Sequence, residues 1–533
     1  MFTIRSFAVL LTLCLACSSS EETGTSAAAG TGGAGASTST SSGPGSGGGA
    51  TGGGTNTCGS SLNTAEPARY PLELVSPREA GTAPSTDPGT PNMPSGHRIF
   101  RAHPGIEYNV RAVVIGGSYP YRFSLENAPD GMVIDPCSGE ISWPNPRGSA
   151  SPTLTVVDSE DNQVTSSWSI EVTTSGFRFV DVSGSDGNSG TLESPWQTLA
   201  KVKDSGAPGD IIYFRSGTYT TQGMATSGSA GTWLRVEFNG QYHPVQWIAY
   251  PGETPVIDNE YVSSTDTGRF IRFSGSDTYP VYLDGLEIIN SWDKGMQFGS
   301  GTDYAVFRRL SIHAIHEAID GSNSAGIMTL ASYGDPSFYA AYQDNDFHDN
   351  APGGIKQYSH MKLLWEDCQF RNSGGGPDLK ASVPRFEVRN CAFLNNRGNM
   401  CGLFGNMHGE GAEIASGEIR YNLMLCPDSP IIAMDVNQDG MAGEIHLYRN
   451  TFIGGVRVRN TDSADGPFHF EHNVIVNSSE ATDHIDLEAV TDPSRISYSE
   501  NLTGTFTDGV VDADGNLQGS YTSHLGTRGH AIP

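Results

Sequence analysis

Short apolar strands recur along the second half of the chain at a regular spacing. In each copy an apolar residue lies two places after an anchor residue, and segments rich in Gly, Asn and Asp separate the copies. The eight copies are LEI (286–288), LSI (310–312), NDF (345–347), CQF (368–370), CAF (391–393), NLM (422–424), NTF (450–452) and NVI (473–475). Such a unit is too small to bury its apolar face alone, so neighbouring units must stack. The pattern therefore predicts a solenoid.

The spacing favours strands over helical repeats. The anchors are 24, 35, 23, 23, 31, 28 and 23 positions apart, and no amphipathic helical stripe lies between them. These features predict an all-β fold in which residues 177–533 form a right-handed single-stranded parallel β-helix. That fold displays long ladders of outward side chains, and such a wall suits the binding of a polymer.

A second strand lies between successive anchors, as in GIKQY (354–358) and PDLKA (377–381). With its apolar positions facing inward, two outward columns of side chains result. The first column holds Lys356, Asp378, Gly402, Ala433, Arg457 and Asp486, and the second holds Tyr358, Lys380, Phe404, Asp435, Arg459 and Glu488. Because rungs are about 4.8 Å apart, the first two members of each column should form one patch. We call Lys356, Tyr358, Asp378 and Lys380 the lysine patch.

Residues 68–175 have a different pattern, with alternating runs such as YRFSL, EISW and TLTVVD between turn residues. This pattern predicts a small β-sandwich, with Trp143 in its core. The stretch from Ala128 to Asp135, followed by Ser138-Gly139-Glu140-Ile141-Ser142-Trp143, resembles the immunoglobulin-like and cadherin-like domains of bacterial surface proteins. In that family such domains serve as spacers or adhesion modules.

The N-terminus indicates export. Residues 1–17 combine Arg5 with an apolar run too short to span a bilayer as a helix, which is typical of a signal peptide. Its end, Leu15-Ala16-Cys17, resembles a bacterial lipoprotein signal, which implies lipidation of Cys17 and anchoring to outer-membrane lipid at the cell envelope. An ordinary cleaved signal is the alternative. Residues 18–67 are rich in Ser, Gly, Thr and Ala and predict a flexible tether.

The net charge of the chain limits the partners that it can bind. With 59 Asp and Glu against 31 Lys and Arg, the net charge of −28 opposes binding to nucleic acid. We expect a monomer.

Export permits disulfides, and Cys58 with Cys137 is one option. Cys368 and Cys391 share a repeat position, so they either form a disulfide or remain two buried thiols in a ladder otherwise made of asparagines.

The start of the predicted β-helix carries a family resemblance. Its features are Asp181, Gly184-Ser185-Asp186, Gly190-Thr191, Pro195, Thr198-Leu199, Pro208-Gly209-Asp210 and Gly217-Thr218-Tyr219. This stretch resembles the N-terminal cap and first coil of pectate-lyase-like, or pectin-lyase-like, β-helix proteins. A short helix is expected to begin with Ser194 and Pro195 and to cover the open end of the solenoid. The resemblance implies the fold but leaves lyase, hydrolase, epimerase and non-enzyme open.

The lysine patch suits β-elimination from a uronate polymer, in which a cation neutralises the carboxylate, a base removes the C5 proton and an acid protonates the leaving oxygen. The predicted base is Lys380, with Lys356 and Arg397 as cations. A similarity to alginate-lyase β-helices likewise implies Lys380 and Arg397. Tyr358 is the predicted proton donor, and the substrate-binding candidates are Asp378, His360, His408 and Asp435.

Competing interpretations stay open. The patch could be a surface ion-pair ladder, and the protein a non-catalytic glycan-binding or adhesion protein, or a uronate C5-epimerase. Glycines stand where calcium-dependent pectate lyases carry paired aspartates, so no metal is required, although Ca²⁺ is an option for Asp378 with Glu366 and Asp367. The segment from His313 to Asp320 and the loop from Asp435 to Gly440 read as turns rather than metal sites.

Overall fold

The computed structural model covers the sandwich and the solenoid. It describes residues 66–84, 90, 92–224, 227–229, 233–261, 269–275, 279–299, 302–316, 324–330, 337–358, 360–380, 383–397, 401–408, 413–426, 431–437, 441–477 and 485–505. The predicted signal with Cys17 and nearly all of the predicted tether lie outside these residues. None of the helices in the described ranges has the length and hydropathy that a membrane crossing requires.

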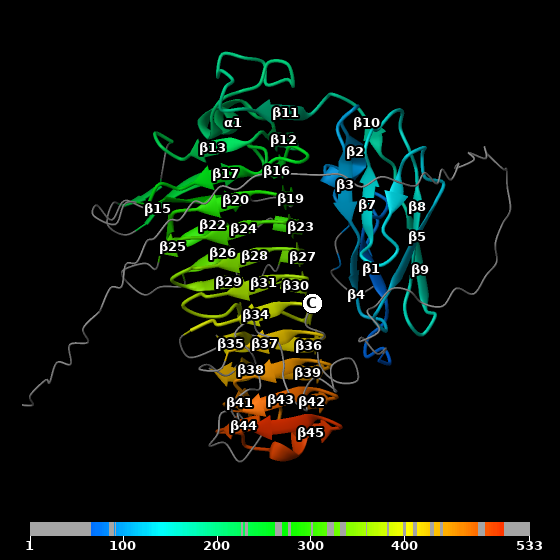
Figure 1. The fold of residues 1–533 in the computed structure, drawn as a ribbon, viewed down its shortest axis with the longest axis vertical. Helices are drawn as coiled ribbons and strands as arrows, with labels where there is room; N and C mark the ends of the chain where they lie inside the picture. The colour runs from blue at the N-terminus through cyan, green and yellow to red at the C-terminus, as the bar shows by residue number, and fades with distance from the viewer. Residues whose placement is uncertain are drawn as a thin grey trace, which may run out of the picture. The chain divides into compact units, whose positions relative to one another are not determined.

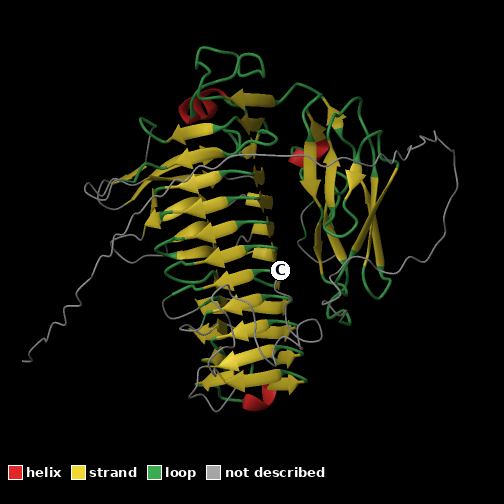
Figure 2. Ribbon diagram, viewed as in Figure 1, coloured by secondary structure: helices red, strands yellow, loops and turns green. Residues whose placement is uncertain are grey.

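The N-terminal domain is built from short, mostly antiparallel strands (Figures 1 and 2). Its elements are β1 (Glu73–Ser76), η1 (Arg98–Phe100), β2 (Arg101–Ala102), β3 (Tyr108–Arg111), β4 (Val113–Ile115), β5 (Arg122–Glu126), β6 (Val133–Ile134), β7 (Glu140–Trp143), β8 (Thr153–Val157), β9 (Gln163–Ser167) and β10 (Glu171–Val172). Alternation along β7 and β8 places every second side chain inside. Trp143 is buried in this core, as predicted.

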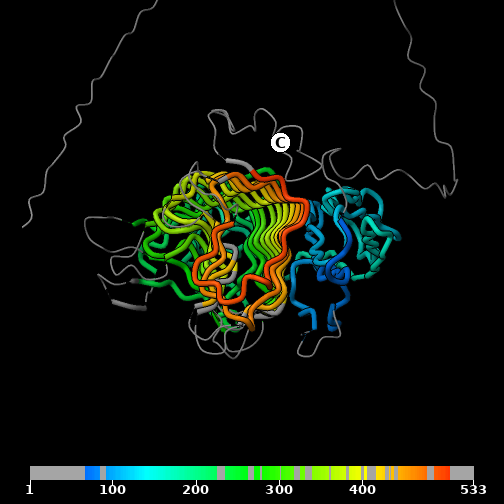
Figure 3. Tube along the Cα trace, turned by 90° about the horizontal axis from the view of Figure 1, so that it is seen from below, coloured from blue at the N-terminus to red at the C-terminus, as the bar shows by residue number. Residues whose placement is uncertain are grey.

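The rest of the described chain winds into a right-handed parallel β-helix whose coils lie over one another (Figure 3). Sheet A contains β11 (Phe177–Val180), β12 (Ile211–Phe214), β16 (Gln246–Ala249), β19 (Tyr279–Asp284), β23 (Thr302–Arg308), β27 (Ser337–Gln343), β30 (His360–Glu366), β33 (Arg385–Arg389), β36 (Glu413–Arg420), β39 (Met441–Tyr448), β42 (Phe468–Glu471) and β45 (Ile496–Ser499). Sheet B contains β13 (Gly217–Thr220), β17 (Pro255–Asp258), β20 (Glu287–Ile289), β24 (Ser311–His313), β28 (Asp346–His348), β31 (Gln369–Arg371), β34 (Ala392–Leu394), β37 (Leu423–Leu425), β40 (Thr451–Ile453), β43 (Val474–Asn477) and β46 (Leu502–Thr505).

Sheet C completes each coil. It contains β14 (Ser227–Ser229), β15 (Trp233–Asn239), β18 (Arg269–Ser274), β22 (Lys294–Phe298), β26 (Ala325–Leu330), β29 (Gly353–Tyr358), β32 (Asp378–Lys380), β35 (Leu403–His408), β38 (Ile431–Asn437), β41 (Val456–Arg459) and β44 (Ile485–Glu488). Two short strands, β21 (Ser291–Trp292) and β25 (Ile315–His316), pair beside it, and η2 (Pro493–Arg495) precedes β45. Each pair of adjacent strands within the three sheets is parallel except β14 with β15.

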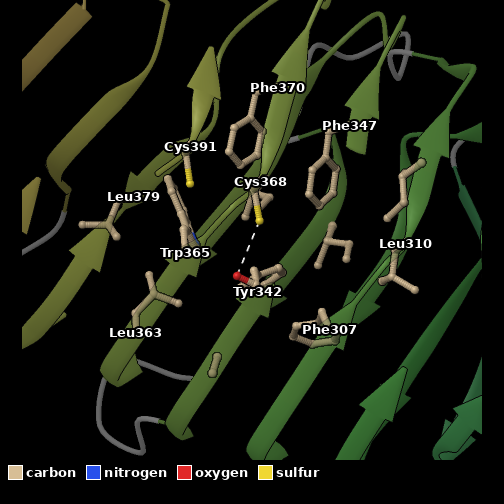
Figure 4. Packing of buried hydrophobic residues seen from close by; sticks show 14 of the residues in the cluster. Phe307, Leu310, Tyr342, Phe347, Leu363, Trp365, Cys368, Phe370, Leu379 and Cys391 are labelled. Atoms are coloured by element: carbon tan, nitrogen blue, oxygen red, sulfur yellow. Dashed lines mark hydrogen bonds between the residues drawn. The ribbon is translucent and has the colours of Figure 1, made fainter. Parts of the chain in front are cut away.

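Sheet B explains the repeat found in the sequence. Its strands place the apolar residue of each motif in register with the next, as in Phe347, Phe370 and Phe393. The rings of Phe347 and Phe370 stack inside the helix with centroids 5.2 Å apart (Figure 4). The centroid of Phe393 lies 5.0 Å from that of Phe370. The predicted anchors turn the corner from sheet A. Asn422, Asn450 and Asn473 bond to one another there and to the backbone of neighbouring coils.

The cap helix exists but begins later than predicted. Helix α1 (Leu199–Ser205) has Thr198 as its N-cap, whose hydroxyl accepts a hydrogen bond from the Lys201 amide. The segment before it is extended because Trp196 bridges to Val180 of β11. The carboxylate of Asp186 accepts hydrogen bonds from the Thr198 amide and hydroxyl, which fixes the turn there. Ser194 therefore does not cap the helix.

The structure decides between a disulfide and two free thiols at Cys368 and Cys391. Cys368 and Cys391 are buried thiols in the ladder, and Figure 4 shows both inside the coil. Cys401 and Cys426, which the sequence did not pair, form a disulfide between adjacent coils with Cα atoms 5.7 Å apart. Cys137 is also in a disulfide, and its predicted partner Cys58 lies outside the described residues.

Candidate active site

The outer face of sheet A is occupied by the sandwich. Arg111 Nη2 lies 2.5 Å from an Asp367 carboxylate oxygen, and the Gly116 amide donates to Glu387 at 2.8 Å. Arg420 Nη1 donates to the Gly117 carbonyl at 3.0 Å. Polymer access to this part of sheet A is therefore blocked, which directs attention to sheet C.

Sheet C brings the lysine patch together in the predicted register. Lys356 pairs with Asp378, and Tyr358 pairs with Lys380, across β29 and β32. The intervening Gln357 and Leu379 are fully buried: Leu379 joins the interior apolar cluster and Gln357 bonds to Tyr342. Because side chains alternate along a strand, the four paired positions belong to the outer face.

The burial of the patch varies from residue to residue. Lys356 is half-buried, whereas Asp378 and Tyr358 retain only 7% and 6% of their exposure. Tyr358 forms a small apolar cluster with Ala325 and Met328 outside the main core. The side chain of Lys380 lies outside what the structure describes, so its place is given by the backbone register alone. The patch thus combines a cation, a carboxylate and a phenol on two adjacent rungs.

Further along sheet C the predicted columns are wrong at three positions. A bulge between Leu379 and Lys380 pairs Lys380 with Asn406 instead of Phe404. Phe404 faces the core, since it pairs with the buried Leu379 and is itself fully buried. Likewise Leu403 and Ile432 stand in the column where Gly402 and Ala433 were expected. An inserted residue leaves no mark in a strand pattern this short.

The carboxylate of Asp435 contacts two neighbouring side chains of the protein. Its carboxylate lies 2.7 Å from Arg459 Nη2 and accepts a hydrogen bond from Asn460 Nδ2 at 2.7 Å. The side chains of His360 and His408 lie outside the described residues, although their backbones belong to β30 and β35. These three substrate-binding assignments stay predictions.

A pocket of about 570 Å³ lies beside this wall, at the turns that connect sheet B to sheet C. It is lined by Ala314, Ile315, His316, Asp349, Asn350, Ala351, Asn372, Ser373, Gly374 and Arg397. Successive coils are fixed there by backbone bonds, including Arg397 N to the Ser373 carbonyl at 2.8 Å. Arg397 is exposed, so its guanidinium is accessible to an anionic ligand.

Close backbone packing requires glycines before Asp378, and this packing disfavours a calcium site. A Cβ on Gly374 would lie 1.8 Å from the Ala351 carbonyl oxygen, and one on Gly376 would lie 1.7 Å from that of Cys401. Aspartate is therefore sterically excluded at both positions. Within the described residues no group of three or more carboxylate, histidine or cysteine ligands gathers around Asp378. The donors there do not match an ion that needs 6–8 oxygens.

The other metal alternatives read from the sequence have ordinary partners. Glu366 bonds to Arg389 and Gln343, and Asp367 pairs with Arg111. His313 bonds to Glu287 at 2.8 Å. Glu317 and Asp320, which follow it in the sequence, lie outside the described residues.

Sequence reasoning missed the charged contact surface of sheet A and the pocket residues Asn350 and Asn372. The run RFEVR (385–389) carried a usable signal, because it places Glu387 and Arg389 among apolar residues on a solenoid strand. Charges at such positions need partners when another domain covers them. The pocket had no comparable signal, since turn asparagines are common in this chain.

Comparisons with known proteins agree with this architecture. The family model of the Pel9A-like right-handed β-helix region matches residues 178–481, and the He_PIG family of Ig domains matches residues 102–173. The chain is 29% identical over 160 residues to the uncharacterized protein YwoF of Bacillus subtilis, covering 30% of each chain. It is 26% identical over 146 residues to pectate lyase PEL9 of Emericella nidulans, covering 27% of this chain and 33% of that one. The matched segments thus span about a third of these relatives.

Among solved structures, pectate lyase Pel9A aligns with 61% of this chain and 79% of its own, at 16% identity and a TM-score of 0.38. A rhamnogalacturonan lyase aligns with 66% of this chain and 99% of its own, at 15% identity and a TM-score of 0.41.

Proposed function

The chain belongs to the Pel9A-like right-handed β-helix family, and on that premise we propose that it cleaves an acidic, uronate-containing polysaccharide by β-elimination. The pectate lyase among its relatives supports a polymer of this class. The observation that carries the proposal is the register of β29 and β32, which sets Lys356 beside Asp378 and Tyr358 beside Lys380.

The reaction requires a base that is neutral before it acts. Lys380 takes the C5 proton of the uronate, the C5–H electron pair forms the C4–C5 double bond, and the C4–O bond breaks. Tyr358, on the adjacent rung, protonates the departing oxygen. The charge of Lys356 disfavours a second protonated amine nearby, which favours the neutral form of Lys380.

Negative charge develops on the uronate carboxylate as the C5 proton leaves. Lys356 and Arg397 are the cations assigned to it, since an amine and a guanidinium both form charge-assisted hydrogen bonds with carboxylates. Asp378 orients Lys356 from the paired position, and His360, His408 and Asp435 are assigned to binding of the flanking sugars. No step passes through calcium, because Gly374 and Gly376 leave no room for acidic side chains.

The test is product analysis with the full chain on polygalacturonate, rhamnogalacturonan, alginate and glycosaminoglycans. Elimination creates an unsaturated uronate, detected by its ultraviolet absorbance and confirmed by mass spectrometry. A saturated product would indicate hydrolysis, and deuterium uptake at C5 without chain shortening would indicate epimerisation. Retention of one polymer with no chemical change would favour a binding protein. Each of the last three results would overturn the proposal.

We also propose that the protein is exported and anchored through a lipid on Cys17, which would place it where extracellular polymers occur. The Ser/Gly-rich tether that follows supports this. Metabolic labelling with a radioactive fatty acid should mark the wild-type chain and leave Cys17→Ala unlabelled. Equal labelling of both would refute the anchor.

A further inference from the structure

A second group of reactive side chains lies on the outer face of sheet A. Glu444 and His446 are two residues apart on β39, so they face the same side, and His469 of β42 is directly paired with His446. The two imidazole rings stack with centroids 4.5 Å apart and planes within 14°. This cluster is separate in the fold from the lysine patch, which belongs to sheet C.

The three side chains converge on one point. Glu444 Oε1 lies 3.4 Å from His446 Nε2 and 3.1 Å from His469 Nε2. One ligand atom from each residue lies within 4.8 Å of the others. A tetrahedral ion with bonds of about 2.0–2.2 Å needs its donor atoms roughly 3.4 Å apart, which these two N–O separations already approach.

A hydrogen bond on its second ring nitrogen prepares His469 as a ligand. His469 Nδ1 lies 2.8 Å from Ser497 Oγ. With the proton on Nδ1 the Nε2 lone pair points at the cluster, and a second bond of this kind is what fixes metal-bound histidines. His446 is largely buried, and the stacked ring of His469 fixes its orientation.

We propose that Glu444, His446 and His469 bind a divalent transition-metal ion, with Zn²⁺ the best match, through two imidazoles and one carboxylate. Two nitrogen donors favour Zn²⁺ over Ca²⁺ or Mg²⁺, which prefer oxygen. The carboxylate is 49% exposed, so an ion can enter from solvent. A fourth position is left for water.

The surroundings tolerate the added charge. Arg69 is the cation that approaches His446, and its guanidinium is paired with Glu471 at 2.6 Å. The hydroxyl of Tyr70 donates to the Glu444 carbonyl at 3.0 Å, and its ring meets His446 edge-on. The site therefore lies where the segment leading into the sandwich contacts β39.

The chain offers a matched control on sheet B. His313 and His348 also stack on paired positions, with centroids 4.6 Å apart. Each of these histidines has its own acidic partner. Glu287 bonds to His313, whereas Asp349 bonds to Nδ1 of His348 at 2.8 Å. Stacked histidines alone are thus present in both places, but only the Glu444 cluster has an oxygen shared by both rings.

Calorimetric titration of the full chain with zinc chloride, using protein purified without a histidine tag, tests the proposal. We expect one Zn²⁺ per chain and at least a roughly tenfold loss of affinity in His469→Gln and in Glu444→Gln. Both substituted side chains are partly exposed, so these variants should fold, and circular dichroism verifies this. Binding should weaken as pH falls through the range where histidine protonates.

His348→Gln should bind Zn²⁺ as the wild type does. No saturable binding by the wild type, or affinity unchanged in both His469→Gln and Glu444→Gln, would overturn the assignment. Loss of binding in His348→Gln alone would place the ion on sheet B and would equally refute it. None of these outcomes depends on activity toward a polysaccharide.

Discussion

Single buried charges connect the sandwich to sheet A. Glu387 is fully buried and accepts hydrogen bonds from Arg389 Nη1, Arg420 Nε and the Gly116 amide. Burial alone would raise the pKa of Glu387, but the guanidiniums of Arg420, Arg389 and Arg385 hold it at about 2. The carboxylate is thus balanced by its partners rather than by water, and removing it would leave their charges buried.

Glu387→Gln should therefore lower the free energy of unfolding by about 3–5 kcal/mol, since it leaves the buried guanidinium of Arg420 without its ion-pair partner and Arg389 with Glu366 alone. Urea denaturation of the full chain measures this. Glu488→Gln is the matched control, because Glu488 is 56% exposed and lies 3.5 Å from Arg457. Its effect should stay within about 0.5 kcal/mol. Equal effects of the two changes would contradict this account of Glu387.

The same residue predicts acid sensitivity. The pKa of Glu387 is about 2 in the folded chain against an ordinary value of 4.5, so its stabilisation is complete above pH 4.5 and is lost as pH falls toward 2. The shift corresponds to on the order of 3 kcal/mol. Asp367 has the opposite effect on stability as the pH falls. Burial raises its pKa to about 6, so its protonation below that pH favours the folded state.

Denaturant midpoints recorded from pH 7 to pH 2.5 should rise slightly below pH 6 and then fall below pH 4.5. The fall should be smaller in Glu387→Gln than in the wild type. A steady decline beginning at pH 7, identical in both proteins, would be inconsistent with these two carboxylates.

At the scale of elements, the corner between sheets A and B is held by amide side chains. Asn450 Nδ2 donates to the Ile419 carbonyl at 2.7 Å and to Asn473 Oδ1 at 3.0 Å, while its own Oδ1 accepts from Asn422. Because each asparagine bonds to the coil before and the coil after, the ladder links rungs that are distant in sequence. A break in it leaves buried polar groups unpaired.

Asn450→Ala should cost about 2–4 kcal/mol of unfolding free energy, since several buried hydrogen bonds are lost together. Gln369→Ala is the comparison: Gln369 also lies in sheet B, but its side chain is exposed, and we expect a change within about 0.5 kcal/mol. A cost for Asn450→Ala no larger than that of Gln369→Ala would mean that the ladder does not stabilise the helix.

Several elements could be predicted from the sequence, and others could not, for physical reasons. The pairing of Lys356 with Asp378 follows from the repeat and from the alternation of side chains along a strand, so the sequence was sufficient to predict it. The inward position of Phe404 could not be predicted, because the length of the turn before β35 sets its pairing with Leu379 and the apolar pattern does not encode that length. Cys401 and Cys426 meet only because particular turns have particular lengths, which composition does not encode.

At the scale of the whole molecule, the sandwich is docked rather than loosely tethered. Ion pairs join it to sheet A at several coils, including Arg111 with Asp367 and Lys362 with Glu73. Apolar residues of both domains share one buried cluster, in which Leu74 and Val114 accompany Tyr339 and Leu364. The domain thus contributes to the fold of the helix, beyond the spacer role that its family resemblance implies.

Calorimetry of the full chain should therefore show the sandwich and the helix unfolding in a single transition. The apolar side chains of sheet A that share a buried cluster with the sandwich, such as Tyr339 and Leu364, would be exposed to water if the sandwich left first, and that exposure is costly. Two well-separated transitions would contradict docking as a source of stability.

The central claim is that the outward lysines of adjacent coils in sheet C form the reaction centre, and the initial rate of unsaturated-uronate formation by Lys380→Ala tests it most directly. Removal of the base should reduce the rate by roughly 10²–10⁴-fold, with an unchanged circular dichroism spectrum. Arg457→Ala, which removes a cation from the same sheet in a surface pair with Asp486, should retain nearly full activity. An unaltered rate for folded Lys380→Ala would contradict the account.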